Sequence, residues 1–455
     1  MDGLEASVRK MREEGIADPA IHSFAHYYRL LSEGETGMLP ESALAPLKDA
    51  PDADELPEAD QDVLDRAVVI KLNGGLGTSM GMTRAKSLLE VKDGLSFLDV
   101  IARQVLELRR RHGARLPLVL MNSFATRDDS LAALERYPGL AGDVPLDFVQ
   151  GKVPKLTADE LQPASWPDDP RLEWAPPGHG DLYTSLVTSG MLAELLEHGY
   201  EFAFVANSDN LGAVLEPRIL SWFAREELPF AMEVADRTQA DRKGGHPARL
   251  RAGGLVLRET AQTPEEDLGA LQDTERHRYF NANNVWLDLR ALDRALRQRG
   301  GVLGLPMIVN EKTLDPADTS SPKVIQLETA MGAAVGVFEG AAAIRVPRRR
   351  FTPVKTTNDL LVLRSDAYRL RDDAQIELAA PAVPFVDLDP RHFKLLRDFD
   401  RRFCHGPPSL VACAHLAVEG DVAFGRHVVV RGEVTVRNEA SDQLRIADGA
   451  VLEGD

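Results

Sequence analysis

Cysteine and long apolar runs are scarce in this 455-residue sequence. Its two cysteines, Cys404 and Cys413, occur late in the chain without the spacing of a metal site. Two reduced, partly buried cysteines are a better interpretation than a disulfide. No run of about 18 apolar residues exists, and the first residues form no apolar signal region. We therefore expect a protein of the cytoplasm with no membrane partner.

Positive charge is also in short supply. The chain has 53 Lys and Arg against 71 Asp and Glu, a formal net charge of −18. Neither a basic tail nor a basic stripe is visible, which argues against nucleic acid as a partner. Phosphate ligands stay possible, because charges beyond about 10 Å are screened at physiological salt and local lysines decide such binding. We expect the basic run 348–350 to be a solvated or salt-bridged face.

A glycine-rich stretch follows the apolar run Val68–Ile70, yet it lacks both common phosphate-loop signatures. The dinucleotide fingerprint needs glycine where Met80 stands, and the Walker motif needs glycine where Ala85 precedes Lys86. What is present still suits phosphate. Glycines let backbone N–H groups approach an anion, and Lys86 adds a mobile charge. The alternative is a turn in which the glycines serve geometry alone.

The length predicts two or three domains. Residues 1–65 read as an N-terminal helical segment, and residues 66–370 alternate between strand and helix patterns, which predicts an α/β fold with a mostly parallel sheet covered on both faces. Residues 371–455 change to short β runs punctuated by glycine, the pattern of a linker and a C-terminal β-helix domain. Expected strands are 67–72, 116–121, 144–149, 201–206, 230–234 and 284–289, and expected helices are 97–112, 182–198 and 325–338.

Polar clusters follow several expected strands, where ligands bind in such sheets. Asp209 in the cluster 207–210 is placed to hold Mg²⁺ through one or two oxygens, with phosphates supplying the rest. His179 projects from a Pro- and Gly-rich turn that precedes a helix. Lys355 stands before a helix that Thr356, Thr357 or Asn358 caps, where a phosphate and the helix dipole meet. Each cluster alone is also compatible with an ordinary surface turn.

Neutral amides and one carboxylate complete the candidate set, and they suit uracil edges and sugar hydroxyls. These weaker candidates are Gln150, Glu233, Gly244, Gly245 and the asparagines at 281, 283 and 284.

The order of these motifs resembles the eukaryotic-type UTP–glucose-1-phosphate uridylyltransferase (UDP-glucose pyrophosphorylase) family, strongly over 66–370 and more loosely in the β tail. The motifs that carry the resemblance are Leu-Asn-Gly-Gly-Leu-Gly-Thr from Leu72, Lys86-Ser87-Leu88, Pro-Pro-Gly-His-Gly-Asp from Pro176, Asn-Ser-Asp-Asn from Asn207, Lys243-Gly244-Gly245, Asn283-Asn284 and Pro-Val-Lys-Thr-Thr from Pro353.

The resemblance implies a Rossmann-like nucleotidyltransferase core with a mixed, mostly parallel sheet, plus the C-terminal β-helix. It implies Mg²⁺ at Asp209 and catalytic roles for Lys86 and Lys355. The implied nucleotide contacts are Leu72, Asn73, Gly74, Gly75, Lys86, Gln150, Gly178 and Asp209. The implied sugar-phosphate contacts are His179, Asn207, Glu233, Gly245, Asn283 and Lys355.

The expected reaction is a single in-line displacement, in which a glucose 1-phosphate oxygen attacks the α-phosphorus of UTP and pyrophosphate leaves. No nucleophilic side chain is needed, in keeping with the lack of a Ser/His/Asp or Cys/His signature. Other readings are the same chemistry on galactose or N-acetylglucosamine 1-phosphate, a non-catalytic UTP sensor, and a kinase or NTPase. Because the sequence ends at Asp455, before a further β-helix strand, we expect a monomer or weak homodimer.

Overall fold

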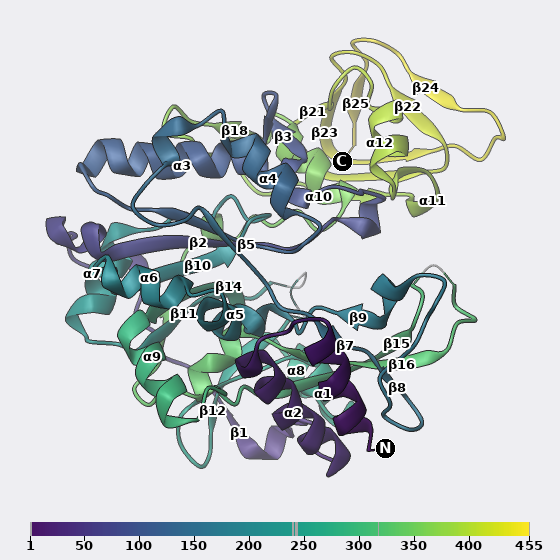
Figure 1. The fold of residues 1–455 in the computed structure, drawn as a ribbon. Coiled ribbons are helices and arrows are strands. Elements are labelled where there is room, and N and C mark those ends of the chain that lie inside the picture. Colours follow the sequence, from purple (N-terminus) through teal and green to yellow (C-terminus); the bar gives the residue numbers. More distant parts are fainter. Residues whose placement is uncertain (1, 239–240, 242–243, 317, 455) are drawn as a thin grey trace.

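The computed structural model describes residues 2–238, 241, 244–316 and 318–454. Lys243, part of one predicted motif, lies outside the described residues. Figure 1 shows a central sheet with helices on both faces, the C-terminal strands at the upper right and the N-terminal helices α1 (Gly3–Glu13) and α2 (Asp18–Ser32) at the lower right.

The central sheet has seven strands in the order β17-β11-β14-β10-β2-β5-β6. Strand β14 is antiparallel to both of its neighbours, and the other pairings are parallel. The predicted mixed, mostly parallel sheet is confirmed. The strand bounds are β2 (Ala67–Asn73), β5 (Leu118–Asn122), β6 (Asp147–Val149), β10 (Phe202–Asn207), β11 (Phe230–Asp236), β14 (Tyr279–Asp288) and β17 (Ala342–Arg345).

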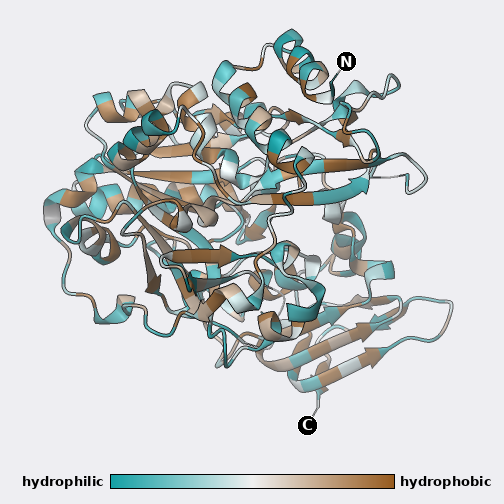
Figure 2. Cartoon of the chain, turned by 90° about the horizontal axis from the view of Figure 1, so that it is seen from below, coloured by the Kyte–Doolittle hydropathy of each residue, from teal (hydrophilic) through white to brown (hydrophobic). Residues whose placement is uncertain are grey.

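The sheet is buried because its central strands are apolar on both faces. Val69 of β2 faces one apolar cluster, which includes residues of α3 (Phe97–His112), whereas Val68 faces a second cluster with α5 (Leu182–Thr188). Figure 2 shows the apolar residues concentrated on these strands. Because β10, β2, β5 and β6 are parallel, their carboxyl ends lie at the same edge of the sheet. The candidate residues were expected at this edge.

Two helix predictions have different outcomes. The helix 97–112 is confirmed, because Ser96 and Asp99 form a capping box at its start and Gly113, at φ 64°, ends it. The single helix expected over 182–198 is instead two, α5 and α6 (Met191–Glu197), because Gly190 at φ 79° interrupts the helical backbone.

The helix expected over 325–338 is wrong. Lys323–Thr329 is strand β16, which pairs along seven residues with β15 (Met307–Thr313) and also with β8 (Leu156–Thr157). Met331–Gly336 then forms a 3-10 helix. At Gly332 an added Cβ lies 2.9 Å from a Leu257 side-chain carbon, so tight packing selects a short turn here. Apolar content alone could not distinguish this from a buried helix.

Smaller elements surround the sheet. Strands β1 (Leu44–Pro46), β12 (His246–Leu250) and β13 (Leu255–Arg258) form a separate antiparallel sheet. The remaining elements are β3 (Glu90–Lys92), β4 (Leu95–Ser96), β7 (Val153–Pro154), β9 (Trp174–Ala175), β18 (Tyr368–Leu370), β19 (Ile376–Leu378), α4 (Arg127–Leu134), α7 (Pro217–Arg225), α8 (Leu268–Gln272), α9 (Leu289–Gln298), α10 (Thr357–Arg364), α11 (Pro390–Phe393) and α12 (Leu396–Arg402).

The C-terminal strands stack in parallel. They form one sheet in the order β20-β21-β23-β25 and a second, β22-β24, with Leu416, Phe424 and Val430 buried. Both cysteines are free, Cys404 exposed and Cys413 buried. No helix in the described part of the chain is long and apolar enough for a bilayer crossing. The bounds are β20 (Phe385–Leu388), β21 (Ser409–Glu419), β22 (Val422–Phe424), β23 (Val429–Arg437), β24 (Leu444–Ile446) and β25 (Val451–Glu453).

Candidate active site

The glycine-rich loop begins where β2 ends. The side chain of Asn73 is buried, and its Nδ2 donates to Asn122 Oδ1 at 2.7 Å and to Ser130 Oγ at 2.8 Å. It therefore fixes the end of β2 to β5 and α4. The Asn73 Oδ1 is buried and has no partner in the described structure. Leu72 packs beside the second apolar cluster, and its carbonyl oxygen accepts from the Ser208 N–H at 3.1 Å.

Gly74 and Gln150 lie against each other. An added Cβ at Gly74 lies 2.5 Å from Gln150 Oε1, so the Gln150 amide packs directly on the Gly74 backbone. Ser123 Oγ donates to the Gly74 carbonyl at 3.0 Å, and the Gln150 N–H donates to Asn122 O at 2.7 Å. These bonds bring an amide side chain beside an open stretch of backbone.

The loop closes on its lysine. The Lys86 N–H donates to Gly75 O at 2.9 Å, and Gly77 adopts φ 67° beside the Lys86 side chain. Nothing lies within 4 Å of a Cβ added at Gly75. The backbone at Gly75 is therefore open to a ligand, as a phosphate loop requires.

The Gly178–His179 turn docks on the end of β16. Gly178 has φ 79°, and a Cβ there lies 2.5 Å from Thr329 O. His179 Nδ1 accepts from the Met331 N–H at 3.0 Å, so the ring proton is assigned to Nε2. Burial lowers the pKa of His179 to about 4. The imidazole is therefore neutral at pH 7 and offers an Nε2–H donor to a phosphate or a hydroxyl.

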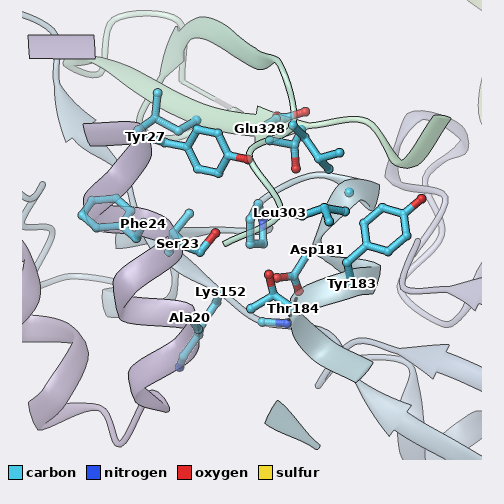
Figure 3. A pocket seen from close by; sticks show the side chains of 17 residues that line it. Ala20, Ser23, Phe24, Tyr27, Lys152, Asp181, Tyr183, Thr184, Leu303 and Glu328 are labelled. Atoms are coloured by element: carbon cyan, nitrogen blue, oxygen red, sulfur yellow. Dashed lines mark hydrogen bonds between the residues drawn. The ribbon is translucent and has the colours of Figure 1, made fainter. Parts of the chain in front are cut away.

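Asp181 joins this turn to the Gln150 strand end. Its Oδ2 accepts from the Gly151 N–H at 2.5 Å and from Ser185 Oγ at 2.6 Å. Figure 3 shows a pocket in which Asp181 and Thr184 face Phe24 and Tyr27 of α2. None of the predicted site residues lines this pocket, which lies behind the two loops and not in the site itself.

Lys86 and Asp209 meet directly. Lys86 Nζ lies 2.6 Å from Asp209 Oδ2, and the two side chains are 16% and 22% exposed. Within the described residues, this place included, no group of three His, Cys, Asp or Glu side chains is arranged for a metal ion. One accessible carboxylate beside a phosphate loop fits Mg²⁺, which takes most of its ligands from substrate phosphates and water.

Asn283 carries backbone strain and an open acceptor. It adopts φ 55°, unusual for a residue other than glycine, beside the register shift between Met232 and Val234. Its Nδ2 donates to Asn207 Oδ1 at 3.1 Å, whereas its buried Oδ1 has no partner in the described structure. Strain of this kind clusters at binding sites. The structure thus brings together two predicted sugar contacts, Asn207 and Asn283, and leaves the buried Oδ1 of Asn283 without a partner.

Gly245 faces a carboxylate that sequence reasoning missed. A Cβ at Gly245 lies 2.6 Å from Glu259 Cδ. Burial raises the pKa of Glu259, and the Lys355 ammonium opposes that shift. Two adjacent glycines, Gly244 and Gly245, indicate that another group approaches the backbone closely. That group is Glu259, which follows β13 and faces Gly245 across the paired strands β12 and β13, and no local sequence signal identifies it.

Glu233, one of the predicted sugar contacts, lies in the interior of the fold. Its carboxylate is fully buried and accepts four hydrogen bonds, from Arg350 Nε at 2.8 Å, Arg350 Nη2 at 2.6 Å, Asn284 Nδ2 at 2.9 Å and Trp286 Nε1 at 3.1 Å. Protein donors therefore occupy both carboxylate oxygens. The predicted salt-bridged face is confirmed for Arg348 and Arg349, whereas Arg350 is buried.

Lys355 is held by its backbone, and its side chain extends outward. Its N–H and that of Thr356 both donate to Asp359 Oδ2 at 2.8 Å, and Thr356 is the N-cap of α10, as one of the three predicted caps. The Lys355 side chain is exposed, with its ammonium 6.0 Å from the Phe351 ring centroid. It is thus a mobile cation at the start of a helix.

Comparison with known proteins gives one consistent result. The family model described as UTP–glucose-1-phosphate uridylyltransferase matches residues 21–431. The UTP–glucose-1-phosphate uridylyltransferase of Hordeum vulgare is 40% identical, covering 100% of this chain and 96% of the relative. That of Solanum tuberosum is 40% identical over 91% of this chain and 84% of its own length.

Solved structures agree with the sequence relatives. A mutant UDP-glucose pyrophosphorylase from Leishmania major, in complex with UDP-glucose, superposes with a TM-score of 0.94 at 45% identity, covering 100% of this chain and 99% of the other. A UDP-glucose phosphorylase from Trypanosoma brucei gives a TM-score of 0.92 at 42% identity, with 100% and 98% covered.

Proposed function

The chain belongs to the UTP–glucose-1-phosphate uridylyltransferase family, and from this premise we propose how its residues act. The reaction forms UDP-glucose and pyrophosphate from UTP and glucose 1-phosphate. One observation carries the proposal: the glycine-rich loop closes on Lys86, and Lys86 Nζ lies 2.6 Å from Asp209 Oδ2. A loop suited to phosphate, a cation and a carboxylate that suits Mg²⁺ therefore lie together.

The nucleotide side is formed by backbone and one amide. A Cβ at Gly74 would meet Gln150 and one at Gly178 would meet Thr329, whereas the space beside Gly75 is open. We expect all three glycines to contact the nucleotide through the main chain. Gln150 offers both a donor and an acceptor to the uracil edge. Leu72 and Asn73 contribute through the main chain. The triphosphate then lies along the loop toward Lys86.

Asp209 is the residue that would hold Mg²⁺, and the ion would supply positive charge that neutralises the substrate phosphates. Its carboxylate is accessible once Lys86 leaves it for the pyrophosphate. Lys86 therefore has two alternative anionic partners, Asp209 before the nucleotide binds and the departing phosphates afterwards. No covalent step is assigned to either residue.

The sugar side is formed by Asn207, Asn283, Gly245 and Glu259, which suit hydroxyl groups, and by His179 and Lys355, which suit the phosphate. A phosphate oxygen of glucose 1-phosphate attacks the α-phosphorus of UTP in line, and the bond to pyrophosphate breaks. Lys355 neutralises charge that develops at the α-phosphate. Positioning and charge supply the catalysis, since the phosphate nucleophile is already ionised at neutral pH.

We extend the proposal to the C-terminal strands and to assembly. Parallel pairing of β21 with β23 and of β22 with β24 supports a β-helix for the C-terminal domain. A monomer or weak homodimer in the cytoplasm stays our expectation.

The test is pyrophosphate release from UTP with a panel of sugar 1-phosphates. We expect release that depends on glucose 1-phosphate and exceeds the release with galactose or N-acetylglucosamine 1-phosphate. Inorganic phosphate from UTP alone indicates an NTPase instead, and UTP binding without any sugar-dependent pyrophosphate indicates a sensor.

A further inference from the structure

Two segments far apart in the sequence run side by side beneath the site. One is the turn after β10, which carries Asp209, and the other is the stretch before α10, which carries Lys355. The Val354 N–H donates to Asp209 O at 3.2 Å, and Asn210 forms an isolated antiparallel bridge with Pro353. The main chain of Asp209, the predicted metal ligand, is therefore hydrogen-bonded to Val354, the residue before Lys355.

The buried side chain of Asn210 joins these two segments by hydrogen bonds to backbone groups, as a neighbouring strand would. Its Oδ1 accepts from the Thr352 N–H at 2.9 Å, and its Nδ2 donates to Arg350 O at 3.1 Å. The side chain is 2% exposed. A carboxamide supplies the same donor and acceptor pair as a peptide unit, and no aliphatic side chain replaces both bonds.

The joint is also packed tightly. A Cβ added at Gly212 would clash with the Arg349 carbonyl oxygen and lie 2.9 Å from the Arg350 carbonyl carbon, so the two backbones touch there. Arg350 is itself held by the bidentate pair with Glu233, which accepts from Asn284 and Trp286 of β14. Breaking this buried ion pair would leave Glu233 or Arg350 with an uncompensated charge, so the pair is costly to separate. Arg350 therefore holds the segment that carries Lys355 in a fixed position against the sheet.

We propose that Asn210 is a positioning residue that sets the distance between Asp209 and Lys355 during uridylyl transfer. This inference rests on the proposed function of those two residues. Asn210 touches neither substrate nor metal, and it acts through the backbone on which Lys355 stands. Misplacing a catalytic group by about 1 Å costs about 10²-fold in rate, so we expect loss of the Asn210 amide to lower turnover more than the loss of its hydrogen bonds alone would.

Gln104 provides a matched control. It is another buried amide, 4% exposed, and it donates to Leu211 O at 3.1 Å and to Ala374 O at 3.0 Å. It therefore holds the same turn, one residue beyond Asn210, but by contacts that do not involve the Lys355 segment. A merely structural role for the turn predicts the same kinetic loss from either amide.

The experiment is a double-mutant cycle with purified full-length protein, measuring kcat and KM for both substrates. We expect Asn210→Ala to lower kcat about 10- to 100-fold with KM for UTP changed less than about threefold, and Gln104→Ala to leave kcat within about threefold. In the Lys355→Ala background, Asn210→Ala should lower kcat no further than about threefold, because its effect passes through Lys355. Multiplicative losses in the double variant, or an equal kcat loss from Gln104→Ala, overturn the inference.

Asn210→Asp keeps the test usable if the alanine variant does not fold. The carboxylate retains the acceptor for Thr352 but lacks the donor for Arg350 O. We expect its kcat to be about 10- to 100-fold lower than that of the unsubstituted protein, with KM for UTP changed less than about threefold. A kcat within about threefold of the unsubstituted value contradicts the inference. Failure of the proposed function is seen separately, as absence of sugar-dependent pyrophosphate release from the unsubstituted protein.

Discussion

Lys86 Nζ lies 2.6 Å from Asp209 Oδ2, so the residue assigned to the phosphates and the residue assigned to the metal are paired with each other. Each therefore restrains the other until substrate arrives. A divalent cation that approaches the free protein competes with an ammonium for the same oxygen. In the proposed function, the nucleotide draws Lys86 away and makes the Asp209 carboxylate available.

This pairing predicts that Lys86→Ala increases cation affinity in the nucleotide-free protein while it lowers turnover. A partly exposed ion pair contributes up to about 1 kcal/mol, so we expect Mn²⁺, used as a probe for Mg²⁺, to bind about two- to fivefold tighter in the variant. Titration followed by electron paramagnetic resonance measures it. Asp209→Asn should abolish the gain, and unchanged Mn²⁺ affinity in Lys86→Ala contradicts the competition.

Gly178→Ala tests the nucleotide side. The new Cβ lies 2.5 Å from Thr329 O on a backbone with φ 79°, and the turn must move to relieve this contact. Strain of about 1–3 kcal/mol predicts KM for UTP raised about 5- to 150-fold. Gly190→Ala is the matched control, since its φ is also 79° but nothing lies within 4 Å. Equal effects of the two substitutions on KM would mean that the turn is not a nucleotide contact.

His179 predicts a pH dependence of stability. Burial lowers its pKa to about 4, whereas a histidine in the unfolded chain titrates near 6.5. Between these values the unfolded chain binds a proton that the folded protein does not, so stability is present above about pH 6.5 and is lost as the pH falls toward 4. His179→Gln should therefore flatten the fall of the unfolding free energy over this window. Urea unfolding at several pH values measures the slope, and an unaltered slope rejects the buried neutral imidazole.

Glu259→Gln tests the sugar side. A hydrogen bond to a charged group contributes about 1.5–3 kcal/mol, so we expect KM for glucose 1-phosphate to rise about 10- to 150-fold with little change for UTP. The exposed Glu266, changed to Gln, is the control. A variant that affects UTP and sugar equally shows that Glu259 supports the fold and does not bind sugar.

Local sequence signals were sufficient for the sheet and for the loops. The helix 97–112, the glycines from Gly74 and the Thr356 cap depend on residues close in sequence, and the sequence analysis identified each of them. The strand Lys323–Thr329 was misread because it is apolar enough for a buried helix, and its pairing with β15 and β8 is a tertiary fact.

Contacts between distant segments account for what the sequence did not show at Glu233 and Glu259. Glu233 has the residue type of a sugar contact, but its donors Arg350 and Trp286 come from distant segments and bury it. Glu259 was missed for the complementary reason, since Gly245 meets it across a strand pair. A sequence shows which polar residues follow strands, whereas the assignment of their partners requires the assembled fold.

The most direct test of the account is pyrophosphate release from UTP and glucose 1-phosphate by Asp209→Ala and Lys355→Ala, with folding checked by circular dichroism. Both side chains are assigned to the transferring phosphate, so we predict kcat at least about 10²–10³-fold lower in each folded variant. Near-normal turnover in a folded variant would contradict the role of that residue.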